Sequence, residues 1–481
     1  MMRLSALLLS STIMMSAYSA HAEIRPVVDV TTELATDLRS LAFGADGKIY
    51  ASGNEHFDRA KLTTIILRFN QDGTLDQSFG EDGAVRLDLA DEAPLQKGRR
   101  RQQSFGIVEL QNGDILATVH ALDPQGGQSI YLIRLDHNGK QIVGPRWGDS
   151  RGRVEVVFGW PNSDNTKFPG EVGPVDSAWN LWVDPTNAER IYVVGHGPGP
   201  EGSGRVNLDR YVAALKIADG SPDQSFNSGK PVSYNSLNDL TDNNRRAKVE
   251  PDGSILSAGW TDFGKGFGNY ATILRILPDG TFDPQFGNFI YPADTGTKLG
   301  LKPQPGVAVF NPFQEDGGMT ESYAAMAVGS GVWLSSGPGE TTAAERSSTL
   351  GFKAAQANDF VAVAFDKDGL RKDWGKGGVQ AVQSEGTGVK DPHEEIADAV
   401  MLPDGRSVNV GLYGGAPAAI VLKPDGSLDT SVSNDGVIEL PNEKVKSGFN
   451  AAFLSPDGKR IAITSDVDEK GSRLVVLSDE N

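Results

Sequence analysis

Short hydrophobic segments separated by glycine turns recur along the chain. The first complete unit, residues 38–88, contains Asp-Gly pairs at 46–47 and 72–73 and a Phe-Gly pair at 79–80. Asp-Gly readily adopts the positive φ angles that tight hairpin turns require. Each pair therefore predicts a turn between two antiparallel strands, and the unit is predicted to be a four-stranded meander.

The same pattern returns along the chain with varying completeness, and no sustained helical period interrupts it. A single meander cannot bury both of its faces, whereas radial stacking of several meanders buries them all. We therefore predict an all-β fold, a β-propeller of seven four-stranded blades. The aromatic residues after the second turn are predicted to pack between neighbouring blades: Phe79, Trp147, Phe226, Phe286 and Trp374. The predicted repeats cover about 38–88, 104–157, 178–234, 246–293, 323–383, 397–440 and 448–478.

The last repeat ends without an obvious fourth strand. Residues 25–30 form a spare hydrophobic segment ahead of the first repeat. Pairing this segment with the last repeat would close the ring and remove the exposed sheet edges of an open array. We therefore expect the mature N-terminal strand to complete the seventh blade.

Three segments carry a resemblance to a known repeat. Residues 67–80 read LRFNQDGTLDQSFG, and residues 274–287 and 421–429 follow the same pattern. These segments are similar to the signature of the bacterial delta-60 repeat. The resemblance implies an exported, propeller-like protein and supplies no catalytic residues.

The N-terminus has the features of a secretory signal peptide. Arg3 precedes a hydrophobic run to Ser19, and Ala20-His21-Ala22 provides a small-x-small cleavage site. We predict a signal peptide over residues 1–22 and one propeller domain over 23–481, located in the periplasm or secreted. No later segment is long and apolar enough to span a membrane.

Amino-acid composition excludes or disfavours several kinds of partner and site. The formal net charge is −18, which disfavours nucleic acid and anionic membranes as partners. The chain has no cysteine, which excludes disulfides, thiol nucleophiles and thiolate metal sites. No motif indicates a cofactor.

Loop lengths point to one face as the functional surface. The turns joining strands one and two, and strands three and four, are short, whereas the connections between strands two and three and between units are long. In a meander both kinds of long connection emerge on the same rim. Long loops collected on one face of a repeat array commonly form its binding surface.

Basic residues in these loops are candidates for anion binding. Guanidinium groups bind carboxylates and phosphates with paired hydrogen bonds. The alternative is a solvated loop, or ion pairs to neighbours such as Asp91 and Glu92. The candidates are Lys97, Arg99, Arg100, Arg101, Arg245 and Arg246.

Two further groups are weaker candidates. Asp391, His393, Glu394, Glu395 and Asp398 form a histidine–carboxylate cluster suited to a divalent metal or to acid–base chemistry, although it lacks the second histidine of a helical zinc motif. Aromatic side chains in or beside the long loops offer stacking platforms, with packing between blades as the alternative. These aromatics are Trp160, Trp179 and Tyr270.

Together these features predict an exported propeller that binds a small anionic ligand or a protein partner on its long-loop rim. The alternative is a hydrolase or lyase that acts on an anionic sugar, ester or lactone at the central channel. That alternative would combine His393, Glu395, Asp176 and Arg246 near the axis. A purely structural role is a third possibility.

Overall fold

The hairpin turns lie where the Asp-Gly pairs predict them. Gly47 and Gly73 have φ angles of 78° and 85°, and the side chain of the preceding aspartate accepts a backbone N–H two residues on, at 3.0 Å in both turns. These turns join neighbouring antiparallel strands of one sheet. The computed structural model describes residues 24–55, 58, 60–92, 101–124, 128–159, 177–200, 203, 205, 207–237, 240–264, 266–314, 318–329, 331–340, 359–384, 395–440, 449–467 and 471–479.

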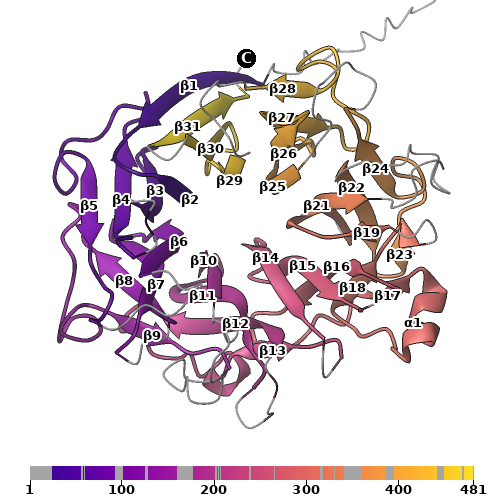
Figure 1. The fold of residues 1–481 in the computed structure, drawn as a ribbon, viewed down its shortest axis with the longest axis horizontal. Helices are drawn as coiled ribbons and strands as arrows, with labels where there is room; N and C mark the ends of the chain where they lie inside the picture. The colour runs from indigo at the N-terminus through magenta and orange to yellow at the C-terminus, as the bar shows by residue number, and fades with distance from the viewer. Residues whose placement is uncertain are drawn as a thin grey trace, which may run out of the picture.

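Seven sheets surround a central axis, which confirms the predicted all-β propeller (Figure 1). Blade one contains β2 (Asp37–Phe43), β3 (Ile49–Asn54), β4 (Thr64–Phe69) and β5 (Ala84–Leu87). Blade two contains β6 (Gln102–Glu109), β7 (Ile115–Leu122), β8 (Gln128–Leu135) and β9 (Val154–Val156). Blade three contains β10 (Ser177–Asp184), β11 (Asn187–Pro198), β12 (Leu208–Lys216) and β13 (Val232–Tyr234), with a 3-10 turn over Asn227–Gly229.

The second half of the ring is less regular. Blade four contains β14 (Asp242–Val249), β15 (Ile255–Asp262), β16 (Asn269–Ile276), β17 (Gly287–Tyr291), the helix α1 (Ala293–Leu299) and β18 (Val307–Phe310). Blade five contains β19 (Met319–Thr320), β20 (Ala324–Gly329), β21 (Val332–Glu340), β22 (Asp359–Asp366), β23 (Gly369–Leu370) and β24 (Val379–Val382). Blade six contains β25 (Glu395–Met401), β26 (Ser407–Tyr413), β27 (Ala416–Leu422) and β28 (Val437–Glu439).

The N-terminal strand closes the ring, as predicted. Blade seven consists of β29 (Phe449–Leu454), β30 (Arg460–Val467), β31 (Gly471–Ser478) and β1 (Arg25–Thr32). β1 pairs antiparallel with β31, so the first strand of the described chain lies beside its last strand (Figure 1). Arg473 in β31 binds Asp29 in β1 through two hydrogen bonds of 2.7 and 2.6 Å. Both ends of the propeller are thus held in one sheet.

The recurring aromatic-glycine pair links one blade to the next. Phe79 is fully buried in a cluster with residues of blade two, and the N–H of Gly80 donates to the carbonyl of Asn138 at 2.8 Å. The N–H of Gly375 makes the corresponding bond to Asp425 at 3.1 Å. Trp147, Phe226, Phe286 and Trp374 are buried in the same way, which confirms the predicted interblade packing. The repeat signature therefore encodes contacts between blades.

Blades four and five depart from the predicted four strands, and blade five gains the two-residue strands β19 and β23. Blade four differs more. The segment 294–322, predicted to be a connection between units, contains most of α1 and all of β18, which pairs with β16 as the fourth strand. β17 then pairs in parallel with β18 as an additional outer strand. The helix has only seven residues and ends at Gly300 in the left-handed conformation, so it is too short to produce a helical period in the sequence.

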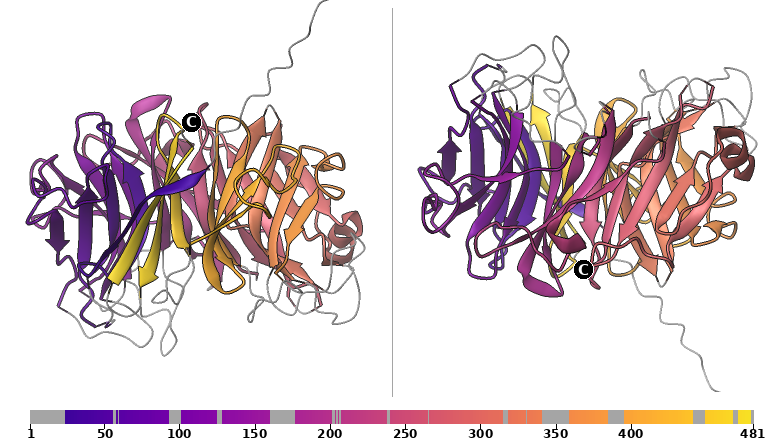
Figure 2. Two further views of the ribbon diagram at one scale, coloured as in Figure 1. Left: turned by 90° about the horizontal axis from the view of Figure 1, so that it is seen from above. Right: turned by 90° about the horizontal axis from the view of Figure 1, so that it is seen from below.

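The strands of each blade run between two rims of the propeller (Figure 2). We call the edge where the innermost strands end in glycine turns the turn rim, and the opposite edge the bulge rim. Because β2 begins where β3 ends, with Asp37 opposite Asn54, the connections into strand one and out of strand two share the bulge rim. Within the described part of the chain, no helix has the length and hydrophobicity needed to cross a membrane.

Candidate functional site

One extra residue interrupts the innermost strand of each blade at the bulge rim. Six of these strands shift register at one residue: Arg39, Phe105, Trp179, Arg245, Ala397 and Asn450. In blade five the N–H of Tyr323, just before β20, donates to the carbonyl of Ser336, which also lies opposite Ala324. A β-bulge redirects a side chain away from the regular alternation of a strand.

Glycine in the second strand makes room for most of these bulges. A Cβ atom on Gly411 would lie 1.7 Å from the carbonyl oxygen of Glu395 in the facing strand, far inside contact distance. A Cβ on Gly195 would lie equally close to the carbonyl of Ser177. Gly53, Gly259 and Gly337 occupy the corresponding positions in blades one, four and five. The glycine near the end of strand two in these five blades thus permits close approach of the backbone.

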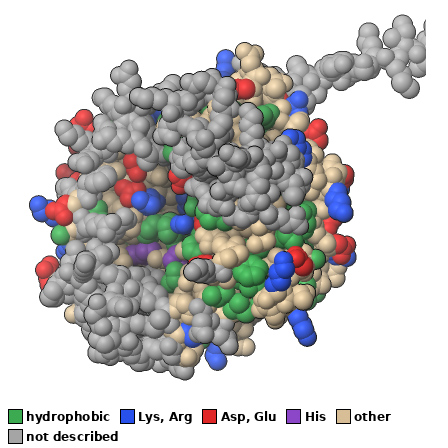
Figure 3. Space-filling model, turned by 45° about the vertical axis from the view of Figure 1, so that its right-hand side comes forward, with side chains coloured by type: hydrophobic (Ala, Val, Ile, Leu, Met, Phe, Trp, Pro, Cys, Tyr) green, Lys and Arg blue, Asp and Glu red, His purple; other side chains and the backbone are tan. Residues whose placement is uncertain are grey.

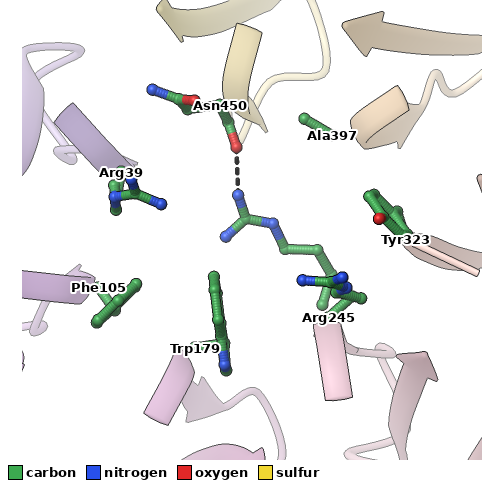
Figure 4. Close-up of a pocket in the computed structure, with 8 residues that line it drawn as sticks. Arg39, Phe105, Trp179, Arg245, Tyr323, Ala397 and Asn450 are labelled. Atoms are coloured by element: carbon green, nitrogen blue, oxygen red, sulfur yellow. Dashed lines mark hydrogen bonds between the residues drawn. The ribbon is translucent and has the colours of Figure 1, made fainter. Parts of the chain in front are cut away.

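The seven redirected residues surround one cavity, and we call them the bulge ring. They come from seven different blades and, with Arg246, line a cavity of about 160 Å³ on the axis (Figure 4). In the space-filling view, basic, acidic, histidine and hydrophobic side chains lie together in a hollow on one face of the molecule (Figure 3). The ring members are Arg39, Phe105, Trp179, Arg245, Tyr323, Ala397 and Asn450.

Three arginines and no described acidic residue line this cavity. Arg39 pairs with Asp37 at 2.7 Å, and this pairing outweighs burial and raises the pKa of the arginine. Arg245 lies 4.0 Å from Glu321, and its guanidinium carbon lies 4.8 Å from the centre of the Tyr323 ring. The buried Nε of Arg245 has no hydrogen-bond partner among the described residues. A guanidinium group has five N–H donors, and beyond its buried Nε the terminal nitrogens of Arg245 make no hydrogen bond within the described residues, so they can bind a ligand.

Arg246 is the least exposed of the three arginines. One of its terminal nitrogens donates to the carbonyl of Asn450 in blade seven (Figure 4), and its Nε lies 3.7 Å from Asp398 in blade six. Burial lowers the pKa of Arg246, and the nearby charges of Arg39 and Arg245 act in the same direction, while Asp398 opposes them. Positive charge is thus crowded at this point, and a bound anion would relieve the crowding.

Aromatic rings form one side of the cavity. Trp179 packs against Phe105 with ring centres 4.8 Å apart and against His196 at 6.1 Å. Burial, helped by the charges of Arg245 and Arg210, lowers the pKa of His196 to about 4. His196 is therefore neutral at neutral pH, and this side of the cavity is a largely apolar surface.

The structure brings some of the predicted residues together and leaves others apart. Arg245, Arg246 and Trp179 line the cavity. Tyr270 is buried inside blade four, where its hydroxyl lies 3.1 Å from that of Thr295. Arg101 lies outside the cavity and pairs with Asp88 and Glu92.

The histidine–carboxylate cluster is only partly described. Glu395 begins β25, and Asp398, three residues on, pairs with Arg246 and lies 3.6 Å from Lys248. Within the described ranges, no group of His, Asp and Glu side chains is arranged to hold a metal ion. The remaining candidates lie outside the described residues: Lys97, Arg99, Arg100, Trp160, Asp176, Asp391, His393 and Glu394.

Four ring residues besides Ala397 escaped the sequence reasoning: Arg39, Phe105, Tyr323 and Asn450. They lie at the start of innermost strands, outside the long loops from which candidates were drawn. A glycine in strand two marks Arg39 and Tyr323, because that glycine faces the bulge. The second strands of blades two and seven contain no glycine, so this signal does not mark Phe105 or Asn450.

Comparison with known proteins supports the fold and leaves the activity open. Residues 44–79 and 250–286 match a family model described as a domain of unknown function (DUF5122) beta-propeller. These are β-propeller repeats. The two matches span the glycine turns and the aromatic residue of blades one and four, and neither includes a bulge-ring residue. The chain matches no curated protein.

Proposed function

We propose that the protein is an exported β-propeller that binds a small anionic ligand, a carboxylate or a phosphate, at the bulge ring. The observation that carries this proposal is the convergence of three guanidinium groups from two blades on one cavity that no described acidic side chain lines. Guanidinium groups bind both kinds of anion with strong, directional hydrogen bonds. The described lining also lacks histidine and carboxylate groups, which favours binding over acid–base catalysis.

The size and lining of the cavity narrow the ligand further. Its volume of about 160 Å³ is below the range of about 300–1,000 Å³ that is usual for drug-sized ligands. The cavity therefore suits a small molecule, or the anionic end of a larger one whose remainder lies on the bulge rim. Phe105, Trp179 and Tyr323 favour an anion carried on a flat or apolar body.

Export and repeat family form part of the same proposal. The signal-like residues 1–22 lie outside the described residues and support delivery to the periplasm or the exterior. The motif resemblance supports assignment to the delta-60 repeat group.

Calorimetric titration with benzoate and with inorganic phosphate tests the proposal. We expect wild-type protein to bind at least one of them with a single site, and binding to weaken as salt increases. Arg245→Ala should weaken binding about tenfold, because it removes a charge-assisted hydrogen bond. Arg101→Ala is the matched control, since it removes one ion-paired arginine outside the cavity.

Two results would overturn the proposal. One is an absence of binding by the folded wild-type protein to both anions. The other is equal weakening by Arg245→Ala and Arg101→Ala, which would show that the anions respond only to overall charge.

A further inference from the structure

The channel axis continues beyond the bulge ring into a closed middle section. A space of about 30 Å³ lies between Arg39, Trp182, Arg246 and Asp398. This space has room for little more than water. The axis is therefore blocked between the two rims.

Three cross-axis contacts form this block, which we call the axial plug. Arg246 and Lys248 of blade four both face Asp398 of blade six, at 3.7 and 3.6 Å. Below them the rings of Trp182 in blade three and Phe453 in blade seven stack with centres 5.3 Å apart. Side chains from four blades thus close the channel.

A second and larger cavity opens beyond the axial plug, at the turn rim. Its volume is about 410 Å³, and its walls come from the innermost strands β10, β14, β20, β25 and β29, with one residue from β15. Most of its lining is apolar, including Trp182, Val249, Met326, Val400, Met401 and Phe453. Both its size and its lining are those of a small-molecule site.

The charged groups in the wall of this cavity are already paired. Lys248 pairs with Asp398 and donates to the carbonyl of Ala399. Glu250 accepts a hydrogen bond of 2.6 Å from Arg275 and one of 3.3 Å from the indole of Trp333. A charged ligand would find no free counter-charge among these groups, so the lining favours a neutral one.

We propose that the turn-rim cavity is a second binding site, separate from the bulge ring, that takes a neutral, apolar small molecule. The axial plug forms its floor and five innermost strands contribute to its walls, a concave shape that fits a small molecule better than a flat protein surface. The flexible thioethers of Met326 and Met401 can adjust to the shape of an apolar ligand. This site goes beyond the proposed function, because it shares no ligand chemistry with the bulge ring.

Titration of the full chain with N-phenyl-1-naphthylamine, a neutral dye that fluoresces in apolar surroundings, tests this inference. We expect one dye per protein and quenching of tryptophan emission, since Trp182 lies in the wall. Ala327→Phe should fill the cavity, and Met401→Gln should make it more polar at similar volume, each weakening dye binding about fivefold or more.

Two control variants separate this site from other apolar surface and from the bulge ring. Val143→Gln changes an exposed hydrophobic residue of blade two and should leave dye binding unchanged. Arg245→Ala should also leave dye binding unchanged, and Ala327→Phe should leave benzoate or phosphate binding unchanged. The two proposals can therefore fail independently.

Three outcomes would overturn the inference. Dye fluorescence that does not rise with folded protein would show that the cavity does not bind the probe. Binding that resists both Ala327→Phe and Met401→Gln would place the dye elsewhere. Loss of dye binding as the sedimentation coefficient rises with protein concentration would show that a second copy of the chain covers the cavity.

Discussion

The two rims of this propeller are built from the same repeat, but they differ in which structural features recur from blade to blade. At the turn rim, both side chains and backbone recur: an Asp-Gly turn, an aspartate and a buried aromatic-glycine pair that binds the next blade. At the bulge rim only the β-bulge of the innermost strand recurs, whereas the seven ring positions carry six residue types. The difference teaches that the repeated side chains build the scaffold, whereas the positions that do not repeat are those at which we propose that a ligand binds.

The charged residues of the two rims differ in the same way. At the turn rim Asp76 pairs with Arg68 at 2.6 Å and Asp223 pairs with Arg190 at 2.6 Å, so charge there is used within the scaffold. Hydrogen bonds and these arginines lower the pKa of both aspartates despite burial, which acts to raise it. At the bulge rim, by contrast, the arginines outnumber the acidic residues that line the cavity.

The largest effect on stability is expected from removing β1, the strand that closes the ring. Deleting residues 23–34 removes β1 and exposes the edge of β31 along with the apolar residues around Val28. We expect the melting temperature to fall by more than about 10 °C in a thermal scan. Val27→Ser, at a half-exposed position of the same strand, is the control. A fall of less than about 2 °C for the deletion would contradict ring closure as a source of stability.

Glycine substitutions contrast the two rims directly. Gly411→Ala at the bulge rim should destabilise the fold by about 3 kcal/mol or more, because the new Cβ collides with the carbonyl of Glu395. Gly113→Ala at the turn rim should cost only about 1 kcal/mol, because its φ of 81° is strained for alanine while the nearest atom lies 3.5 Å away. Urea unfolding measures both. Equal costs would show that the bulge does not depend on close backbone approach.

A smaller effect on folding stability is expected when the pH is lowered. The pKa of His196 is about 4 in the folded protein and about 6.5 when exposed, so the folded state binds fewer protons between these values. Its contribution to stability is present above pH 6.5 and is lost as the pH falls toward 4, by about 3 kcal/mol in total. His196→Gln should therefore lose less stability than the wild type between pH 7 and pH 5 in urea unfolding.

Two comparisons isolate this effect. Burial raises the pKa of Asp242 to about 6, which contributes with the opposite sign in the same window, so the difference between variant and wild type is the quantity to measure. His137→Gln, at an exposed turn of the turn rim, is the control for a His→Gln substitution outside the core. An identical pH dependence in the wild type and His196→Gln would count against a buried neutral histidine.

The turn rim could be predicted almost completely from the sequence, because its turns depend on local residues. Asp46-Gly47 and Phe79-Gly80 specify their conformations within a few positions, and the repeat adds the same information in other blades. The closing strand also followed from the missing fourth strand of the last repeat. The short helix α1 and the extra strand β17 were missed because neither has a periodic pattern.

The bulge ring was predicted only in part, for a physical reason. A bulge breaks the alternation of inward and outward residues, so neither the hydrophobic pattern nor a charge distinguishes Phe105 and Asn450 in the sequence. Arg245, Arg246 and Trp179 were identified by residue type and loop position. Their convergence with Arg39 depends on closing the ring, which brings blades one and four to the same cavity.

Ring closure also sets the order in which the molecule can be completed. β1 and its partner β31 lie far apart in the sequence, with Asp29 and Arg473 separated by 444 positions. The seventh blade therefore cannot form until β31 has been synthesised, and contacts this distant in sequence form slowly. Until then blades one to six form an open array whose seventh blade is incomplete.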